Sequence, residues 1–279
     1  MTYPLPSVSV ALVWGRARID PLDAKVLLCH ALGCSSAHLS AWPERTLSED
    51  TWRKYQTLVV RRERGEPTAY LTGWKEFYGR TFMVSPAVLI PRPETELLVE
   101  IALAHFQEKS GIHLLDLGTG SGILAITLAL ELDKADVTAV DQSLEASYTA
   151  MANAARLGAS ISFVQSDWFS AIEGDLFHLI VSNPPYVAEN DERLLHSDIR
   201  FEPHSALASG PNGLDDLIRI IEQAPHHLET GGLLLVEHGY DQSVIVRSLL
   251  LDAGFSHITS WRDLSGIERV SGGRWEGKK

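Results

Sequence analysis

The feature that most restricts the fold is an alternation of short apolar runs with helix-like segments from residue 113 onward. Buried parallel strands are apolar throughout, and neighbouring parallel strands need a crossover, usually a helix, between them. The runs fall near residues 113–117, 136–140, 162–166, 177–182, 232–237 and 257–262. A last extended stretch, residues 269–275, follows too soon for a crossover helix, so we expect it to return antiparallel. The sequence therefore predicts an α/β fold with a mostly parallel sheet covered on both faces.

The first 70 or so residues show helical signals only. Asp20-Pro21 places a capping residue before a proline at the first helical position, and Gly33 is suited to ending that helix. Residues 26–28 are expected to be buried on it. Ser48 is expected to begin a second helix, which ends by Gly65. These signals predict a small helical bundle.

At 279 residues the chain exceeds the usual size of one domain. Residues 77–84, with a turn at Gly79-Arg80, are expected to form a hairpin. The proline-spaced segment 90–93 then precedes a helix expected from about residue 94 to residue 106. We therefore predict a helical domain at residues 1–73, a hairpin and linker at 74–92, and the α/β domain at 93–279.

The charge is distributed unevenly. Residues 1–80 carry 11 Lys and Arg against 8 Asp and Glu, whereas residues 81–279 carry 13 against 28, so the net charge of −12 comes from the C-terminal part. Surfaces that bind nucleic acid need basic residues to displace counterions. The acidic balance argues against DNA or RNA as the direct substrate of the α/β domain.

Cysteine and hydropathy patterns argue against a disulfide-stabilised, metal-binding, secreted or membrane-spanning protein. Cys29 and Cys34 are the only cysteines, with no second pair at ligand spacing, so we expect neither a disulfide framework nor a metal site. The longest apolar run, residues 123–130, is too short to cross a bilayer, and the first 20 residues lack a signal-peptide pattern. We expect a soluble, cytoplasmic, monomeric protein with no membrane partner.

A glycine-rich loop, Asp116-Leu117-Gly118-Thr119-Gly120-Ser121-Gly122, follows the first run of the sheet. Open α/β sheets bind ligands at this position, and glycine lets the backbone approach them closely. The spacing is G-x-G-x-G rather than the dinucleotide G-x-G-x-x-G. Asp141 ends the second run, where a carboxylate can accept hydrogen bonds from ribose hydroxyls. Together they indicate a nucleoside-containing cofactor; the alternative is a packing turn and a capping aspartate.

Asp167-Trp168 ends the third run. An aromatic plane at this place can cover adenine, and Asp167 can accept from an exocyclic amine, although Trp168 as core packing is the alternative. If the nucleoside-containing cofactor is S-adenosylmethionine, its sulfonium already activates the methyl group. A protein that binds it needs only to align the nucleophile with the methyl carbon and the sulfur, without a metal or a covalent nucleophile.

The tetrapeptide Asn183-Pro184-Pro185-Tyr186 follows the apolar run 177–181. It is suited to holding a planar NH2 group, whose delocalised lone pair makes it a poor nucleophile that depends on positioning. Asn183 offers its side-chain oxygen, Pro184 presents a carbonyl on a restricted backbone, and Tyr186 can stack on the target's plane. A plain turn is the alternative interpretation.

In this order the motifs resemble the class I S-adenosylmethionine-dependent methyltransferases and, within them, the peptide chain release factor N5-glutamine methyltransferases. The resemblance extends over nearly the whole chain. Further matching segments are Arg61-Arg62, Glu66-Pro67, residues 70–73, residues 90–96, Phe201-Glu202-Pro203, Asp263-Leu264, Gly266 and Glu268-Arg269. Asn212-Gly213 departs from the Asp-Gly of many relatives, and we expect this loop to tolerate change.

The resemblance implies a Rossmann-like methyltransferase domain, with a seven-stranded sheet, behind a five-helix domain that docks the substrate protein. It implies S-adenosylmethionine as cofactor, S-adenosylhomocysteine as product, and the glutamine of the Gly-Gly-Gln motif of class-1 release factors as substrate, in support of translation termination. Cofactor contacts would come from Gly118, Thr119, Gly120, Ser121, Gly122, Asp141, Trp168 and Asn183. The substrate would contact Asn183, Pro184, Pro185 and Tyr186, of which Asn183, Pro184 and Tyr186 would be catalytic.

Three other functions remain open at this point. Glutamine methylation of a ribosomal protein uses the same chemistry. Methylation of an exocyclic amine in nucleic acid shares the Asn-Pro-Pro-Tyr motif and predicts salt-dependent binding. A non-enzymatic module that only holds a translation factor is the third. Glu237-His238, at the end of another run, is interpreted as structural support.

Overall fold

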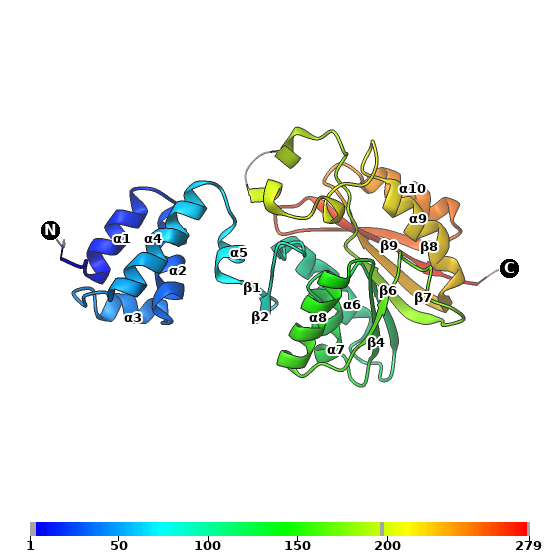
Figure 1. Cartoon of the computed structure of the whole chain (residues 1–279). Helices are drawn as coiled ribbons and strands as arrows, with labels where there is room; N and C mark the ends of the chain where they lie inside the picture. Colours follow the sequence, from blue (N-terminus) through cyan, green and yellow to red (C-terminus); the bar gives the residue numbers. More distant parts are fainter. Residues whose placement is uncertain (1–3, 196–197, 278–279) are drawn as a thin grey trace. The chain divides into compact units, whose positions relative to one another are not determined.

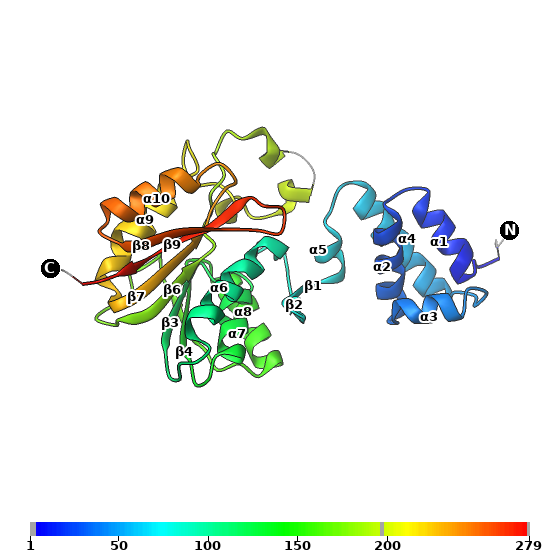
Figure 2. The same cartoon turned by 180° about the vertical axis from the view of Figure 1, so that it is seen from behind.

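The computed structural model describes residues 4–195 and 198–277 (Figures 1 and 2). The chain divides into two compact units, residues 1–74 and 75–279. The first unit is helical, as predicted. Its helices are α1 (Val8–Arg16), α2 (Pro21–Leu32), α3 (Ser36–Ala41), α4 (Glu49–Glu63) and α5 (Thr68–Thr72).

The helix signals read from the sequence of the first unit are confirmed. The Asp20 side chain caps α2, and Gly33 ends that helix at a φ of 64°. Leu27 and Leu28 are fully buried, but the prediction that Val26 is buried was wrong, since it is 37% exposed. At helical spacing, positions 24, 27 and 28 share one face, and position 26 lies outside that stripe.

A hairpin of β1 (Trp74–Phe77) and β2 (Arg80–Met83) follows α5, and all of it except Trp74 belongs to the second unit. Its turn lies at Tyr78-Gly79, one residue before the predicted Gly79-Arg80, because both Tyr78 and Gly79 have positive φ angles, 49° and 68°. Such a pair matches the twist of the two strands. A short 3-10 helix, Pro93–Thr95, then leads into α6 (Glu96–Phe106).

The sheet of the second unit has seven strands in the order β5-β4-β3-β6-β7-β9-β8. β9 pairs antiparallel with both β7 and β8, as predicted, whereas the pairs among the other strands are parallel. The strands are β3 (His113–Leu117), β4 (Asp136–Asp141), β5 (Ser162–Gln165), β6 (Phe177–Ser182), β7 (Leu228–Glu237), β8 (Ser256–Arg262) and β9 (Glu268–Trp275). β7 begins four residues earlier than predicted, and its register with β6 shifts across the Thr230-Gly231-Gly232 segment.

Helices cover both faces of the sheet (Figures 1 and 2). Consecutive strand residues alternate between two cores: Leu114 packs with α6, α7 and α8, while Leu115 packs with α9 and α10. Because both faces are covered, consecutive positions of the central strands are mostly apolar, as at Leu114, Leu115 and Leu117 of β3. The helices are α7 (Ile123–Glu131), α8 (Leu144–Leu157), α9 (Asp215–Gln223) and α10 (Ser243–Asp252). None of the described helices has the length and apolar character needed to cross a membrane.

Candidate functional site

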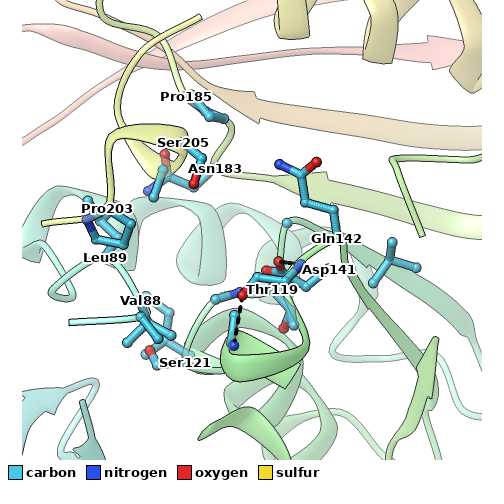
Figure 3. A pocket seen from close by; sticks show the side chains of 18 of the residues that line it. Val88, Leu89, Thr119, Ser121, Asp141, Gln142, Asn183, Pro185, Pro203 and Ser205 are labelled. Atoms are coloured by element: carbon cyan, nitrogen blue, oxygen red, sulfur yellow. Dashed lines mark hydrogen bonds between the residues drawn. The ribbon is translucent and has the colours of Figure 1, made fainter. Parts of the chain in front are cut away.

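Three segments that follow neighbouring strands meet at one edge of the sheet. β3 lies between β4 and β6, so the strand order reverses at this point, where open α/β sheets bind ligands. The glycine-rich loop leaves β3, Asp141 ends β4, and Asn183 follows β6 directly. They surround a cavity of about 310 Å³. Figure 3 shows Asn183 on one side of this cavity and Thr119 on the opposite side.

The glycine-rich loop needs glycine at several positions. Gly118, Gly120 and Gly122 have φ angles of 74°, 56° and 84°, which side chains rarely adopt. A Cβ on Gly122 would lie 2.7 Å from the Ile126 side chain, whereas a Cβ on Gly120 would meet nothing within 4 Å. The loop is therefore packed tightly at its helix end and open at Gly120, which lines the cavity.

Asp116 is buried behind this loop and supports it. Its Oδ2 accepts hydrogen bonds from the Thr119 hydroxyl at 2.7 Å and from the Ala125 backbone N–H at 3.1 Å. Its Oδ1 is buried without a partner. Burial raises the pKa of this carboxyl to about 7, although the two hydrogen bonds oppose the rise.

Asp141 lies at the cavity with both carboxylate oxygens engaged. Oδ2 accepts from the Gly120 N–H and Oδ1 from the Ser143 N–H, each at 2.9 Å. Burial raises the pKa of Asp141, and the two backbone donors oppose that rise. Each carboxylate oxygen has a further lone pair, so Asp141 can still accept a hydrogen bond from a ligand hydroxyl.

Trp168 lies against the glycine-rich loop and lines the cavity. A Cβ on Gly118 would come within 3.2 Å of its ring, and its Nε1 donates to Asp216 Oδ1 at 2.9 Å. Asp167 also lines the cavity, but its Oδ2 is paired with Arg219 at 2.8 Å. Sequence reasoning missed Asp216, which follows no strand and is brought to the cavity by the first turn of α9.

Only two residues of the tetrapeptide after β6 line the cavity. Asn183 and Pro185 line the cavity, whereas Pro184 is buried and Tyr186 is half-buried, and neither of these two is among the lining residues. The Asn183 Nδ2 donates to Thr95 Oγ1 at 3.0 Å, and its Oδ1 is buried with no hydrogen-bond partner. Asn183 thus carries an unused acceptor.

Tyr186 is held from both ends. Its hydroxyl donates to Glu237 Oε1 at 3.1 Å, and its backbone carbonyl accepts from the Gln242 side chain at 3.0 Å. Burial beside Glu237 raises the pKa of the Tyr186 hydroxyl. The carbonyl also touches Gly213, where a Cβ would lie only 2.3 Å from it. The loop around Gly213 therefore packs directly on the tetrapeptide, and this contact leaves no room for a side chain at that position.

Two further segments complete the cavity; the sequence had placed the first in the linker, with Arg92 either facing the substrate or pinning that linker, and had given the second a part only in the resemblance. Residues 87–89, 91 and 92 of the linker line one part, and Pro203, Ser205 and Ala206 line another. Glu202 joins the two segments, since its carboxylate accepts from the Ile90 N–H at 3.0 Å and pairs with Arg92. No cluster of three or more His, Cys, Asp or Glu suited to a metal occurs among the described residues.

Comparisons with known proteins match both parts of the chain. A family model described as PrmC N-terminal domain matches residues 15–73, and one described as Methyltransferase small domain matches residues 94–213. A Vibrio cholerae protein named release factor glutamine methyltransferase is 48% identical over 257 residues, covering 91% of this chain and 90% of the relative. A Burkholderia pseudomallei protein of the same name is 44% identical over 99% of both chains.

Solved structures share the fold. A Pyrococcus furiosus methyltransferase superposes with a TM-score of 0.55 at 18% identity, covering 80% of this chain and 98% of that one. A Thermus thermophilus 16S rRNA N2 G1207 methyltransferase, solved with AdoMet and guanosine, has a TM-score of 0.55 at 20% identity, covering 74% of this chain and 50% of that one. These matches confirm the predicted α/β methyltransferase fold. By the identity and coverage of its relatives, the chain belongs to the release factor glutamine methyltransferase family, as its motifs had indicated.

Proposed function

We propose that this protein transfers a methyl group from S-adenosylmethionine to the side-chain nitrogen, N5, of the glutamine in the Gly-Gly-Gln motif of class-1 release factors. The observation that carries the proposal is the unpartnered Asn183 Oδ1 in a residue that lines the same cavity as the glycine-rich loop. A buried acceptor without a donor is rare in folded proteins and suits a ligand that brings an N–H. The proposed substrate is taken from the relatives' name, release factor glutamine methyltransferase.

The residues around the cavity fit the proposed cofactor. Gly120 leaves open space where a side chain would stand, Asp141 has free acceptor capacity for hydroxyls, and Trp168 offers an apolar plane. We assign cofactor contacts to these residues, together with Gly118, Thr119, Ser121, Gly122 and Asn183. When bound, S-adenosylmethionine would supply a methyl group already activated by a sulfonium, so the protein's own task is positioning.

The tetrapeptide would perform that positioning. Asn183 Oδ1 would accept one N–H of the glutamine amide, and the Pro184 carbonyl would accept the other. Tyr186 would lie against the amide's plane, and Pro185 would border it. Two acceptors fix the amide nitrogen in one orientation, which is the main source of rate for a nucleophile this weak. A methylated amide nitrogen loses its extra proton readily, so no dedicated base is required.

The two units would have different functions, substrate docking and methyl transfer. We assign docking of the release factor to residues 1–73, the hairpin and linker to residues 74–92, and methyl transfer to residues 93–279, in a monomer acting in the cytoplasm. The acidic balance of the C-terminal part, 13 basic against 28 acidic residues, favours this protein substrate over a nucleic acid. Methylation of a ribosomal protein's glutamine is an alternative with the same chemistry, and the relatives' names favour the release factor.

Labelled S-adenosylmethionine and a purified release factor test the proposal. Wild-type protein is expected to label one glutamine, and Asn183→Ala is expected to lower the rate at least ~10²-fold by releasing the amide. Asn190→Ala, at an exposed asparagine outside the cavity, is the matched control and is expected to turn over normally. Label that persists after Gln→Ala in the Gly-Gly-Gln motif would refute the proposed substrate.

A further inference from the structure

A buried glutamine side chain joins three segments behind the tetrapeptide without lining the cavity. Gln242 lies between β7 and α10 and is 7% exposed. Its Nε2 donates to the Tyr186 carbonyl at 3.0 Å and to the Gly213 carbonyl at 3.1 Å. Its Oε1 accepts from the Gly239 N–H at 2.7 Å. The oxygen and both protons of this amide are therefore engaged.

The turn that carries Gln242 is fixed to the central sheet. The Gln242 N–H donates to the Gly239 carbonyl at 3.1 Å, and the Gly239 N–H donates back to the Gln242 side chain, so two hydrogen bonds join these residues. Gly239 lies two residues beyond the end of β7, and β7 is the neighbour of β6 in the sheet. Gln242 is therefore attached to the strand beside the one from which the tetrapeptide continues.

Two carbonyl oxygens that approach the same point repel each other unless a donor lies between them. The Gln242 NH2 group is such a donor for Tyr186 and Gly213, since one of its protons serves each oxygen. Without this group both carbonyls would lose a hydrogen bond in a place largely closed to water, and separation of the two segments would be favoured. Gln242 therefore sets the spacing between the Gly213 loop and the tetrapeptide.

Movement at the Tyr186 carbonyl would reach the end of the tetrapeptide that we assign to the substrate. Proline rings fix φ at Pro184 and Pro185, and Pro185 also restricts ψ at Pro184. Few torsions between Asn183 and Tyr186 are therefore free to absorb a displacement. The Pro184 carbonyl, our proposed acceptor for one N–H of the substrate amide, keeps its direction only while the Tyr186 backbone is held.

We infer that Gln242 is a positioning residue that acts through the Tyr186 backbone to hold the tetrapeptide in the geometry for methyl transfer. This inference rests on the proposed function. The residue touches neither the cavity nor the glycine-rich loop, so its loss should slow the transfer step without weakening the binding of S-adenosylmethionine.

Substitutions that keep the length of the Gln242 side chain test the inference. Gln242→Glu keeps the acceptor for Gly239 but sets an oxygen, in place of the NH2 group, against the two carbonyls. Gln242→Met removes donor and acceptor together. Leu250→Ala is the stability control, because Leu250 is fully buried on the same helix, α10, in the second core. Gln107→Glu adds the same charge as Gln242→Glu at an exposed glutamine outside the cavity.

Single-turnover methylation of a release factor gives the transfer rate, calorimetry gives the S-adenosylmethionine Kd, and thermal unfolding gives the melting temperature. We expect both Gln242 variants to slow transfer at least ~10-fold, with the Kd changed less than ~2-fold. Leu250→Ala should lower the melting temperature and keep the rate within ~2-fold of wild type, and Gln107→Glu should match the wild type.

Two results would overturn the inference while leaving the proposed function intact. One is a Gln242→Met rate equal to that of Leu250→Ala. The other is a Kd that rises as much as the rate falls, which would place the effect on cofactor binding. Absence of label with the wild type would overturn the proposed function, and the inference with it.

A double-variant cycle tests whether Gln242 acts through the Tyr186 backbone. A Cβ on Gly213 would stand 2.3 Å from the Tyr186 carbonyl oxygen, so Gly213→Ala displaces the same carbonyl that Gln242 holds. Gly213→Ala combined with Gln242→Met should be little slower than the slower single variant, because both changes move one group. Losses that multiply would show that the two residues act independently, contrary to the inference.

The wild-type protein gives a further test that needs no variant. The chain has six glutamines, at positions 56, 107, 142, 165, 223 and 242, and all six lie in the part that the structure describes. Only Gln242 among them is buried. With ¹⁵N-labelled glutamine side chains, one NH2 pair should therefore exchange with water much more slowly than the other five. Six pairs that exchange equally fast would mean that the Gln242 amide is not held, and would overturn the inference.

Discussion

Gly213→Ala should slow methyl transfer by displacing the tetrapeptide, in addition to its cost to the fold. A Cβ at this position would stand 2.3 Å from the Tyr186 carbonyl oxygen, 2.9 Å from its carbonyl carbon and 3.0 Å from the Ala188 nitrogen. Since ordinary contacts begin near 3.4 Å, the Tyr186 backbone would have to move by roughly 1 Å. A displacement of that size in a positioning element costs about 10²-fold in rate. The left-handed φ of 70° adds strain of about 1 kcal/mol.

Gly158→Ala is the matched control, because Gly158 has a similar φ of 77° but nothing within 4 Å of its Cβ position. Both variants should lose about 1 kcal/mol of unfolding free energy in urea titrations from backbone strain, and Gly213→Ala should lose about 1–3 kcal/mol more because its Cβ displaces the Tyr186 backbone. Only Gly213→Ala should also lose methyl-transfer rate, by about 10²-fold, with S-adenosylmethionine affinity within a few-fold of wild type because the glycine-rich loop is untouched. Equal single-turnover rates for the two variants would refute the reasoning, and would support the tolerance that the sequence alone had suggested for this loop.

Three further outcomes follow from contacts around the site. Burial raises the Asp116 pKa to about 7 from an ordinary value of 3.8, so the folded state binds the proton more tightly than the unfolded state. The unfolding free energy should therefore fall as pH rises from about 4 to 7. Asp116→Asn should reduce that fall, measured in urea titrations, by up to about 3 kcal/mol. Asn153→Ala removes hydrogen bonds to Met83 and Ser121, and should lower the unfolding free energy by about 2–4 kcal/mol and weaken cofactor binding measured by calorimetry. Trp168→Phe keeps an aromatic plane but removes the donor to Asp216, and should raise the S-adenosylmethionine Kd about 5–10-fold in the same assay.

The central strands were predictable because burial on both faces makes most of their residues apolar, as it does at Leu114, Leu115 and Leu117. The exceptions have local physical causes. The Tyr78-Gly79 turn requires a non-glycine residue with positive φ, which sequence propensity disfavours. The start of β7 lies before a glycine pair at which the register with β6 shifts, and glycines within a strand obscure its pattern.

The candidate site was predictable only where it is continuous in sequence. Asp141 ends a strand, the glycine-rich loop and Asn183 each follow one directly, and the topology brings such ends together. The contact between Thr95 and Asn183 spans 88 residues, and the contact between Ile90 and Glu202 spans 112. Neither pair leaves a periodic or spacing signal, because the partners belong to different elements and meet only through the fold.

Unsatisfied buried atoms gather around this site. Of the five buried side-chain polar atoms without a partner among the described residues, three belong to Asp116, Asn183 and Glu237. Each such atom costs about 1–3 kcal/mol relative to a hydrogen-bonded one. A fold under selection for stability alone would lose them, but the carboxyls of Asp116 and Glu237 do not line the cavity, so a ligand bound there can satisfy only the Asn183 oxygen among these three atoms. The Asn183 oxygen is the one whose residue lines the cavity, which makes it the acceptor that an incoming amide N–H would satisfy first.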